Sequence, residues 1–234
     1  FGLAILCCLL LPRAARDGAL RALSLLRTKE NYVLSLALAL LSAILVFIVF
    51  YSFEARYHLI DTVAQMFQAK IFATGRLFAP APSEPEFFIA QNMLIESGKW
   101  YSQYPPGHAA LLALGQLLGV PWAVPVLLTT ATVFLLWSFS RRSFGADTAL
   151  LVLLFSLSSP FLLFMGASYM NHVSAAFFLS LALLALFRWE CGGRRAWLAV
   201  SSLAWGGAFL CRPYSSLVLG AASGVSLLVF RGER

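Results

Sequence analysis

A few ionisable side chains interrupt an otherwise apolar chain, and Asp61 is the first that could do chemistry. It lies in RYHLIDTVAQMFQAKIFATG (56–75), where Asp61, Gln65 and Gln68 recur at i, i+4 and i+7 on one side of an amphipathic helix. The other side is apolar: Leu59, Ile60, Val63, Phe67 and Ile71. Gly75 is a plausible helix stop. Such a helix lies along a membrane surface, where its carboxylate could act as a general base or orient a hydroxyl.

The stretch WYSQYPPGHAALLALGQLLG (100–119) is a candidate anion site. Its two prolines fix φ and suit the first turn of a helix, and a helix N-terminus attracts anions. Tyr104 and His108 stand at that start, with Lys99 just before it. The alternative interpretation is a structural turn between a loop and the membrane, with Lys99 as a simple surface charge.

Two further positions place polar side chains beside apolar runs. ASYMNH carries Asn171 and His172, and FLCRPYS carries Arg212. Ionisable groups at membrane depth are costly and call for a functional hypothesis. The structural alternatives are a satisfied histidine and an arginine that reaches the lipid head groups.

The composition requires membrane-spanning helices to position these groups. The 234 residues are 60% hydrophobic and 12% charged, and a soluble domain carries roughly twice that charged fraction. The net charge of +7 could suggest nucleic acid, but the basic residues gather in short stretches between apolar runs, as topogenic loops do. We therefore expect an all-α polytopic membrane protein that binds no nucleic acid. The cysteines show no metal or redox spacing: Cys7, Cys8, Cys191 and Cys211.

The apolar runs and the positive charges define a topology. We expect the tail of a span over 1–11 and full spans over 32–53, 123–140, 196–211 and 215–230, with two more within 146–189. The loops 13–31, 141–147, 188–195 and 231–234 hold 12 of the 17 Lys and Arg, so they face the cytoplasm. Residues 108–119 must then be re-entrant or lie flat outside. If they crossed instead, every later loop would be reversed.

Five motifs in this order resemble the amino-terminal half of a GT-C-fold membrane glycosyltransferase. They are RYHLIDTVAQMFQAKIFATGRLFAPAP, WYSQYPPGHAALLALG, RRSFG, SPFLLFMGASYMNH and FLCRP. The resemblance is to family 39-like enzymes, related to protein O-mannosyltransferases and lipid A aminoarabinose transferases. It implies a GT-C-like helix bundle over 32–234, whose outer catalytic loop 54–107 contains juxtamembrane helices. Residues 1–31 then form a partial span and a basic cytoplasmic loop, and we expect a fragment of a longer chain.

The resemblance also implies an activity and site residues. Such enzymes move a sugar from a polyprenyl-phosphate-linked donor to a lipid, glycan or protein acceptor on the extracytoplasmic face, here of a bacterial plasma membrane. Asp61 matches the family's catalytic acid. The family often has two adjacent acids there, so Glu84 and Glu86 are candidates for the second. The expected donor-binding residues are Lys99, Tyr104, His108, His172 and Arg212.

Other functions remain open at this level. A polytopic transporter or lipid flippase is the main alternative, although the chain shows no internal repeat. A scaffold subunit without chemistry is a third possibility. The motifs indicate no metal, and the cofactor is undetermined. The sugar and the acceptor are not specified by the sequence.

Overall fold

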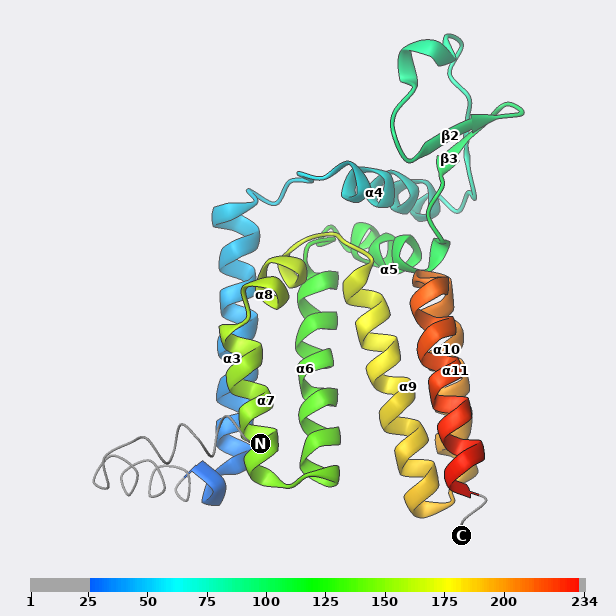
Figure 1. Cartoon of the computed structure of the whole chain (residues 1–234). Coiled ribbons are helices and arrows are strands. Elements are labelled where there is room, and N and C mark those ends of the chain that lie inside the picture. The colour runs from blue at the N-terminus through cyan, green and yellow to red at the C-terminus, as the bar shows by residue number, and fades with distance from the viewer. Residues whose placement is uncertain (1–25, 232–234) are drawn as a thin grey trace.

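The computed structural model describes residues 26–231, which form a bundle of long helices with two shorter helices lying across one end and a small sheet beyond them (Figure 1). The expected partial span 1–11 and most of the basic loop 13–31 lie outside the described residues, as do Cys7 and Cys8.

Three described helices are long and apolar enough to cross a membrane: α3 with the π-helical turn η1 that extends it, α6 and α9. The helix α7 and the short α8 are bent by 64° at Ser159 and make a fourth span if they count as one. The remaining helices of the bundle, α10 and α11, run beside α9 (Figure 1), and their crossing stays a prediction. The bounds are α3 (Glu30–Phe47), η1 (Ile48–Ser52), α6 (Ala123–Ser143), α7 (Ala146–Ser158), α8 (Pro160–Ala167), α9 (His172–Gly192), α10 (Arg195–Cys211) and α11 (Pro213–Arg231).

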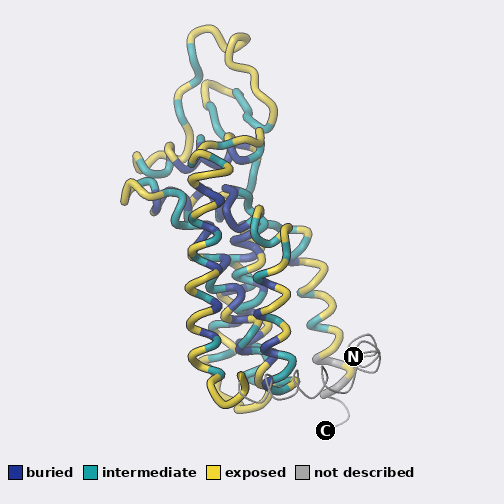
Figure 2. Tube along the Cα trace, turned by 90° about the vertical axis from the view of Figure 1, so that its left-hand side faces the viewer, coloured by how far each residue is buried: buried dark blue, intermediate teal, exposed yellow. Residues whose placement is uncertain are grey.

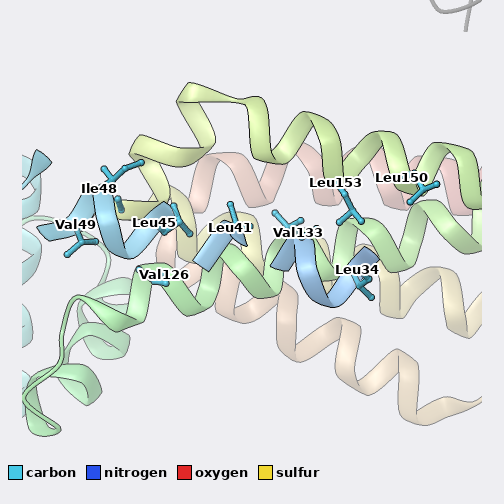
Figure 3. Packing of buried hydrophobic residues seen from close by; sticks show 11 residues of the cluster. Leu34, Leu41, Leu45, Ile48, Val49, Val126, Val133, Leu150 and Leu153 are labelled. Carbon is cyan, nitrogen blue, oxygen red and sulfur yellow. The ribbon is translucent and has the colours of Figure 1, made fainter. Parts of the chain in front are cut away.

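A seam of branched apolar side chains holds α3 against α6 and α7 (Figure 3). On α3 the buried positions recur every three or four residues, which is the period of one helix face. The labelled members of the seam are Leu34, Leu41, Leu45, Ile48, Val49, Val126, Val133, Leu150 and Leu153. The outward faces of the bundle remain exposed along its length (Figure 2), and they carry large apolar side chains that a bilayer would cover.

The helix α5 (Pro106–Leu117) lies across the end of the bundle instead of running along it (Figure 1). This agrees with the prediction that 108–119 does not cross the membrane. The helix α4 (Ile60–Ala73) lies over α5, and the two pack through Met66, Ala69, Leu112 and Ala113. The chain leaves α4 through Gly75, which has a φ of 75° and confirms the expected helix stop.

The polar side of α4 faces the protein. Asp61, Gln65 and Gln68 share one side, as expected, but Gln65 and Gln68 are only 2% and 4% exposed. The apolar Ile60 and Val63 are 52% and 38% exposed. The sequence period identifies two faces but not which of them is covered, and here burial reaches both, because the apolar Ile71 is buried as well as Gln65 and Gln68.

A three-stranded antiparallel sheet stands beyond α4, although only helices were expected in the outer loop. Its strands are β1 (Ala79–Pro80), β2 (Met93–Glu96) and β3 (Lys99–Ser102), in the order β1-β3-β2, and a 3-10 turn, η2 (Pro85–Phe88), precedes β2. Ser97 and Gly98 join β2 to β3 with φ values of 51° and 74°, which suit a two-residue hairpin turn. The buried Gln68 fastens the sheet to α4: its Nε2 donates to Leu77 O at 2.8 Å, and its Oε1 accepts from Ser102 N at 2.9 Å.

Candidate active site

A pocket of about 390 Å³ lies where the first turns of four helices meet. Asp61 comes from the start of α4, Tyr104 from just before α5, His172 from the start of α9, and Arg212 from just before α11. Unpaired N–H groups give each helix N-terminus a partial positive charge. The structure therefore brings four of the predicted site residues to one pocket, in a setting that favours an anion.

The Asp61 carboxylate is held by one of its two oxygens. Oδ1 accepts hydrogen bonds from the Tyr104 hydroxyl and from Asn92 Nδ2, both at 2.6 Å. Gln103 Nε2 donates to Asn92 Oδ1 and so fixes the amide that holds Asp61. No described residue donates to Oδ2, which leaves this oxygen available to a hydroxyl in the pocket.

The Tyr104 phenol stays protonated and donates a hydrogen bond to Asp61. Burial raises its pKa to about 12, and the hydrogen bond and negative charge of Asp61 add to the effect. A phenol with this pKa keeps its proton at neutral pH. It therefore always donates to Oδ1 and does not compete with Asp61 as a base.

Arg212 is placed by the proline that follows it. A residue before proline is disfavoured in the helical conformation, and Arg212 has a φ of −149° at the end of α10, while Pro213 starts α11. Its guanidinium forms no ion pair with any described residue and lies within electrostatic reach of His172. Asn171 Nδ2 donates to Cys211 O at 3.3 Å, which ties the start of α9 to the same turn.

A glycine allows α5 to approach this turn. A Cβ at Gly107 would stand 2.8 Å from the backbone carbonyl atoms of Leu210 and 2.9 Å from Cys211 Sγ. Any larger side chain would push the start of α5 away from α10. The close contact sets the position of Tyr104 relative to Arg212.

Two buried polar atoms in the pocket lining have no partner among the described residues: Gln65 Oε1 and His172 Nδ1. Gln65 is 2% exposed, so its amide oxygen is cut off from bulk solvent. Buried polar atoms are normally hydrogen-bonded. Gln65 Oε1 can only accept a hydrogen bond, whereas the role of His172 Nδ1 depends on its tautomer.

His108 was predicted to bind phosphate, but the structure places it behind the pocket, fully buried. Its Nε2 donates to Tyr169 O at 2.9 Å, so its Nδ1 accepts from the Ser174 hydroxyl at 2.6 Å. Burial lowers its pKa to about 4, which keeps the imidazole neutral. Both ring nitrogens are used in joining α5 to α9, which leaves neither for a ligand.

The other predicted residues also lie outside the pocket lining. Lys99 sits on β3 with its Nζ 4.8 Å from the centroid of the Phe78 ring. Glu84 and Glu86 are exposed at η2. Asn92 was not singled out in the sequence, although it contacts the Asp61 carboxylate directly. Within residues 26–231, no group of three His, Cys, Asp or Glu side chains is arranged to hold a metal ion.

A bundle of membrane-spanning helices with an acid-containing pocket at one end is the architecture of a multi-pass membrane protein. Residues 103–234 match the family described as dolichyl-phosphate-mannose-protein mannosyltransferase, so the chain belongs to this family of membrane glycosyltransferases with polyprenyl-phosphate-mannose donors. The match includes Tyr104, His172 and Arg212 but begins after Asp61. No curated protein and no solved structure matches the chain.

Proposed function

We propose that the pocket binds the phosphate and mannose of the lipid-linked donor and transfers the sugar to an acceptor hydroxyl on the extracytoplasmic side. One observation carries the proposal: the free oxygen of Asp61 and the unpaired Arg212 line the same pocket, among four helix N-termini. The transfer needs a base for the acceptor hydroxyl and an anion site for the donor phosphate, and the two residues could supply them. A transporter is less well supported, because its binding site lies near the middle of the membrane.

The phosphate of the donor belongs beside Arg212. A guanidinium and preorganised backbone N–H groups stabilise phosphate oxygens, most strongly where water is excluded. The polyprenyl tail is hydrocarbon, which requires the pocket to open at the membrane surface. In this proposal the membrane surface lies at the end of the bundle that α4 and α5 cover (Figure 1), next to the pocket.

Asp61 Oδ2 acts as the base in this scheme. The acceptor oxygen attacks C1 of the mannose, its proton passes to Oδ2, and the bond from C1 to the phosphate oxygen breaks. The products are the mannosylated acceptor and the polyprenyl phosphate, whose charge is held beside Arg212. Asn92 and Tyr104 act as positioning residues because they hold Oδ1 and so direct Oδ2 toward the pocket.

The basic loops support an outward orientation of the pocket. The turn from α6 to α7 and the turn from α9 to α10 lie at the end of the bundle opposite α4 (Figure 1). They carry Arg141, Arg142, Arg194 and Arg195, which the positive-inside rule assigns to the cytoplasm. The pocket then faces outward. The acceptor is a hydroxyl of a protein, a lipid or a glycan.

The test is transfer of radiolabelled mannose from polyprenyl-phosphate-mannose in membranes that contain the full chain. Asp61→Asn keeps the shape of the side chain and removes its basicity, so turnover should fall about 10²–10⁴-fold, the usual contribution of acid–base catalysis. Glu84→Gln, an exposed outer acid outside the pocket, is the matched control and should transfer at the wild-type rate. An Asp61→Asn rate within a few-fold of wild type at equal protein levels would reject Asp61 as the base.

A further inference from the structure

A second polar region lies at the opposite end of the bundle, where α6 and α9 end and α10 begins. A pocket of about 490 Å³ there is lined by Arg142, Arg188, Trp197 and three smaller or apolar neighbours, Phe187, Cys191 and Gly192. Arg142 also lines an adjoining pocket of about 730 Å³. Arg188 Nη2 donates to Ser138 Oγ of that second pocket at 3.4 Å, so the two pockets form one basic region.

The arginines of this region carry more charge than its acids neutralise. Arg141 pairs with Glu30, and Arg27 pairs with Asp147. Arg142 and Arg188 form no ion pair with any described residue, yet they lie close enough to repel each other. Two unpaired cations at the edge of a low-dielectric region favour an anion between them.

Two buried donors in the same region also lack acceptors. Arg188 Nε and Trp137 Nε1 have no hydrogen-bond partner among the described residues. Both groups can only donate, so neither can satisfy the other. The Arg188 guanidinium is held in place by the Trp197 ring, whose centroid is 4.5 Å away. An anion with acceptor oxygens would suit both the donors and the arginines that have no partner among residues 26–231.

We propose that this region binds the phosphodiester head group of an anionic phospholipid from the cytoplasmic leaflet. Phosphodiester oxygens are acceptors that carry negative charge, which is what the orphaned donors and unpaired arginines lack. The region lies at the membrane end that the basic loops assign to the cytoplasm, and that leaflet is the one rich in anionic lipids. The exposed apolar helix faces beside it provide room for acyl chains. The inference is independent of the catalytic role of Asp61.

The experiment measures lipid retained on the purified full chain by native mass spectrometry at 0.15 M salt. Phosphatidylglycerol, phosphatidylcholine and inorganic phosphate are each titrated against wild type, Arg142→Gln, Arg188→Gln and Arg195→Gln. Arg195 is the matched control, because it is exposed at the start of α10, at the same end of the bundle, and lines neither pocket. Arg142 is exposed too, so its variant is expected to fold even if Arg188→Gln does not.

Phosphatidylglycerol should bind the wild type in preference to phosphatidylcholine. Each pocket variant should bind it about fivefold more weakly, corresponding to the ~1 kcal/mol that a basic residue contributes near an anionic surface. Arg195→Gln should retain wild-type binding. Equal loss in Arg142→Gln and Arg195→Gln would overturn the proposal in favour of diffuse attraction. Inorganic phosphate that binds as well as the lipid would overturn it in favour of a free-anion site.

Discussion

Both ends of the bundle, named outer and inner after the proposed topology, present positive potential, but they build it from different groups. At the outer end, the pocket gathers the starts of α4, α5, α9 and α11 around Arg212, so backbone N–H groups supply much of the positive charge. At the inner end, α6 and α9 finish while α3, α7 and α10 begin, so backbone partial charges of both signs meet there (Figure 1). Arginine side chains supply the excess positive charge, and Arg141 and Arg142 occupy the last turn of α6.

The two regions differ in how rigidly they hold their positive charge. Backbone donors cannot rotate, so the outer pocket is preorganised and sensitive to small displacements of its helices. The arginine side chains at the inner end are flexible and tolerate a range of ligand positions. An outer pocket of this kind suits a reaction, and an inner region of this kind suits the retention of a lipid.

The largest expected effect is an all-or-none difference between the two ends in cysteine labelling from outside the cell. In a background where the other cysteines are replaced, Gln103→Cys should react with a membrane-impermeant maleimide in intact cells, because Gln103 is exposed at the outer end. The native Cys191 is exposed at the inner end and should react only after permeabilisation. Labelling of Cys191 in intact cells would reverse the two ends.

The next effect concerns the cation of the outer pocket. Arg212→Leu should lower mannose transfer about 10²-fold or more, the scale of removing one preorganised group that stabilises developing charge. Arg212→Lys should retain part of the activity, since the charge remains but the bidentate fork is lost. Arg195→Leu at the inner end is the control. Wild-type transfer by all three variants would show that Arg212 only anchors the turn.

A smaller effect is expected from the amide that holds Asp61. Asn92 has a φ of 67°, which glycine adopts without strain, so Asn92→Gly removes the hydrogen bond and keeps the backbone. Loss of a hydrogen bond to a charged group costs ~1.5 kcal/mol or more, so kcat should fall about tenfold. The KM for the donor should change little, because Asn92 does not line the pocket. An unchanged kcat would remove Asn92 from the mechanism.

The smallest effect is spectroscopic. The pKa of Tyr104 is raised to about 12 from 10.0, so its protonated form is favoured by folding. Its contribution to the free energy of unfolding is complete below pH 10 and is lost as the pH rises from about 10 to 12. The tyrosinate absorbance of wild type minus Tyr104→Phe should therefore stay near zero up to about pH 11. A difference that titrates near pH 10 would mean that the Tyr104 hydroxyl is neither buried nor bonded to Asp61.

The catalytic candidates could be predicted from sequence where an ionisable residue stands next to an apolar run. Asp61 follows the apolar run 32–53 directly, and Arg212 interrupts two apolar runs, so both had to lie near the surface of the bilayer. The fold class followed from the same apolar runs. The flat position of α5 followed from the alternation of basic loops, which a crossing at 108–119 would have reversed.

The other assignments depended on contacts that the sequence does not encode locally. His108 resembles a phosphate ligand until its partners are known, and Tyr169 and Ser174 lie 61 and 66 residues away along the chain. The hairpin had a local signal, because Ser97 and Gly98 stand between MLIE and KWYS. This signal was missed because the whole segment 54–107 was interpreted as a polar loop with helices. Asn92 reaches Asp61 only because that hairpin folds back over α4.

The spread of the pocket along the chain also governs when the protein becomes competent during its synthesis. The lining runs from Asp61 to Ser215 and comes from three separate stretches of the chain, 61–105, 170–172 and 211–215. A nascent chain that has inserted α3 to α9 but not the turn with Arg212 holds Asp61 without this cation. Under the proposed function, transfer therefore cannot begin until that turn has reached the pocket.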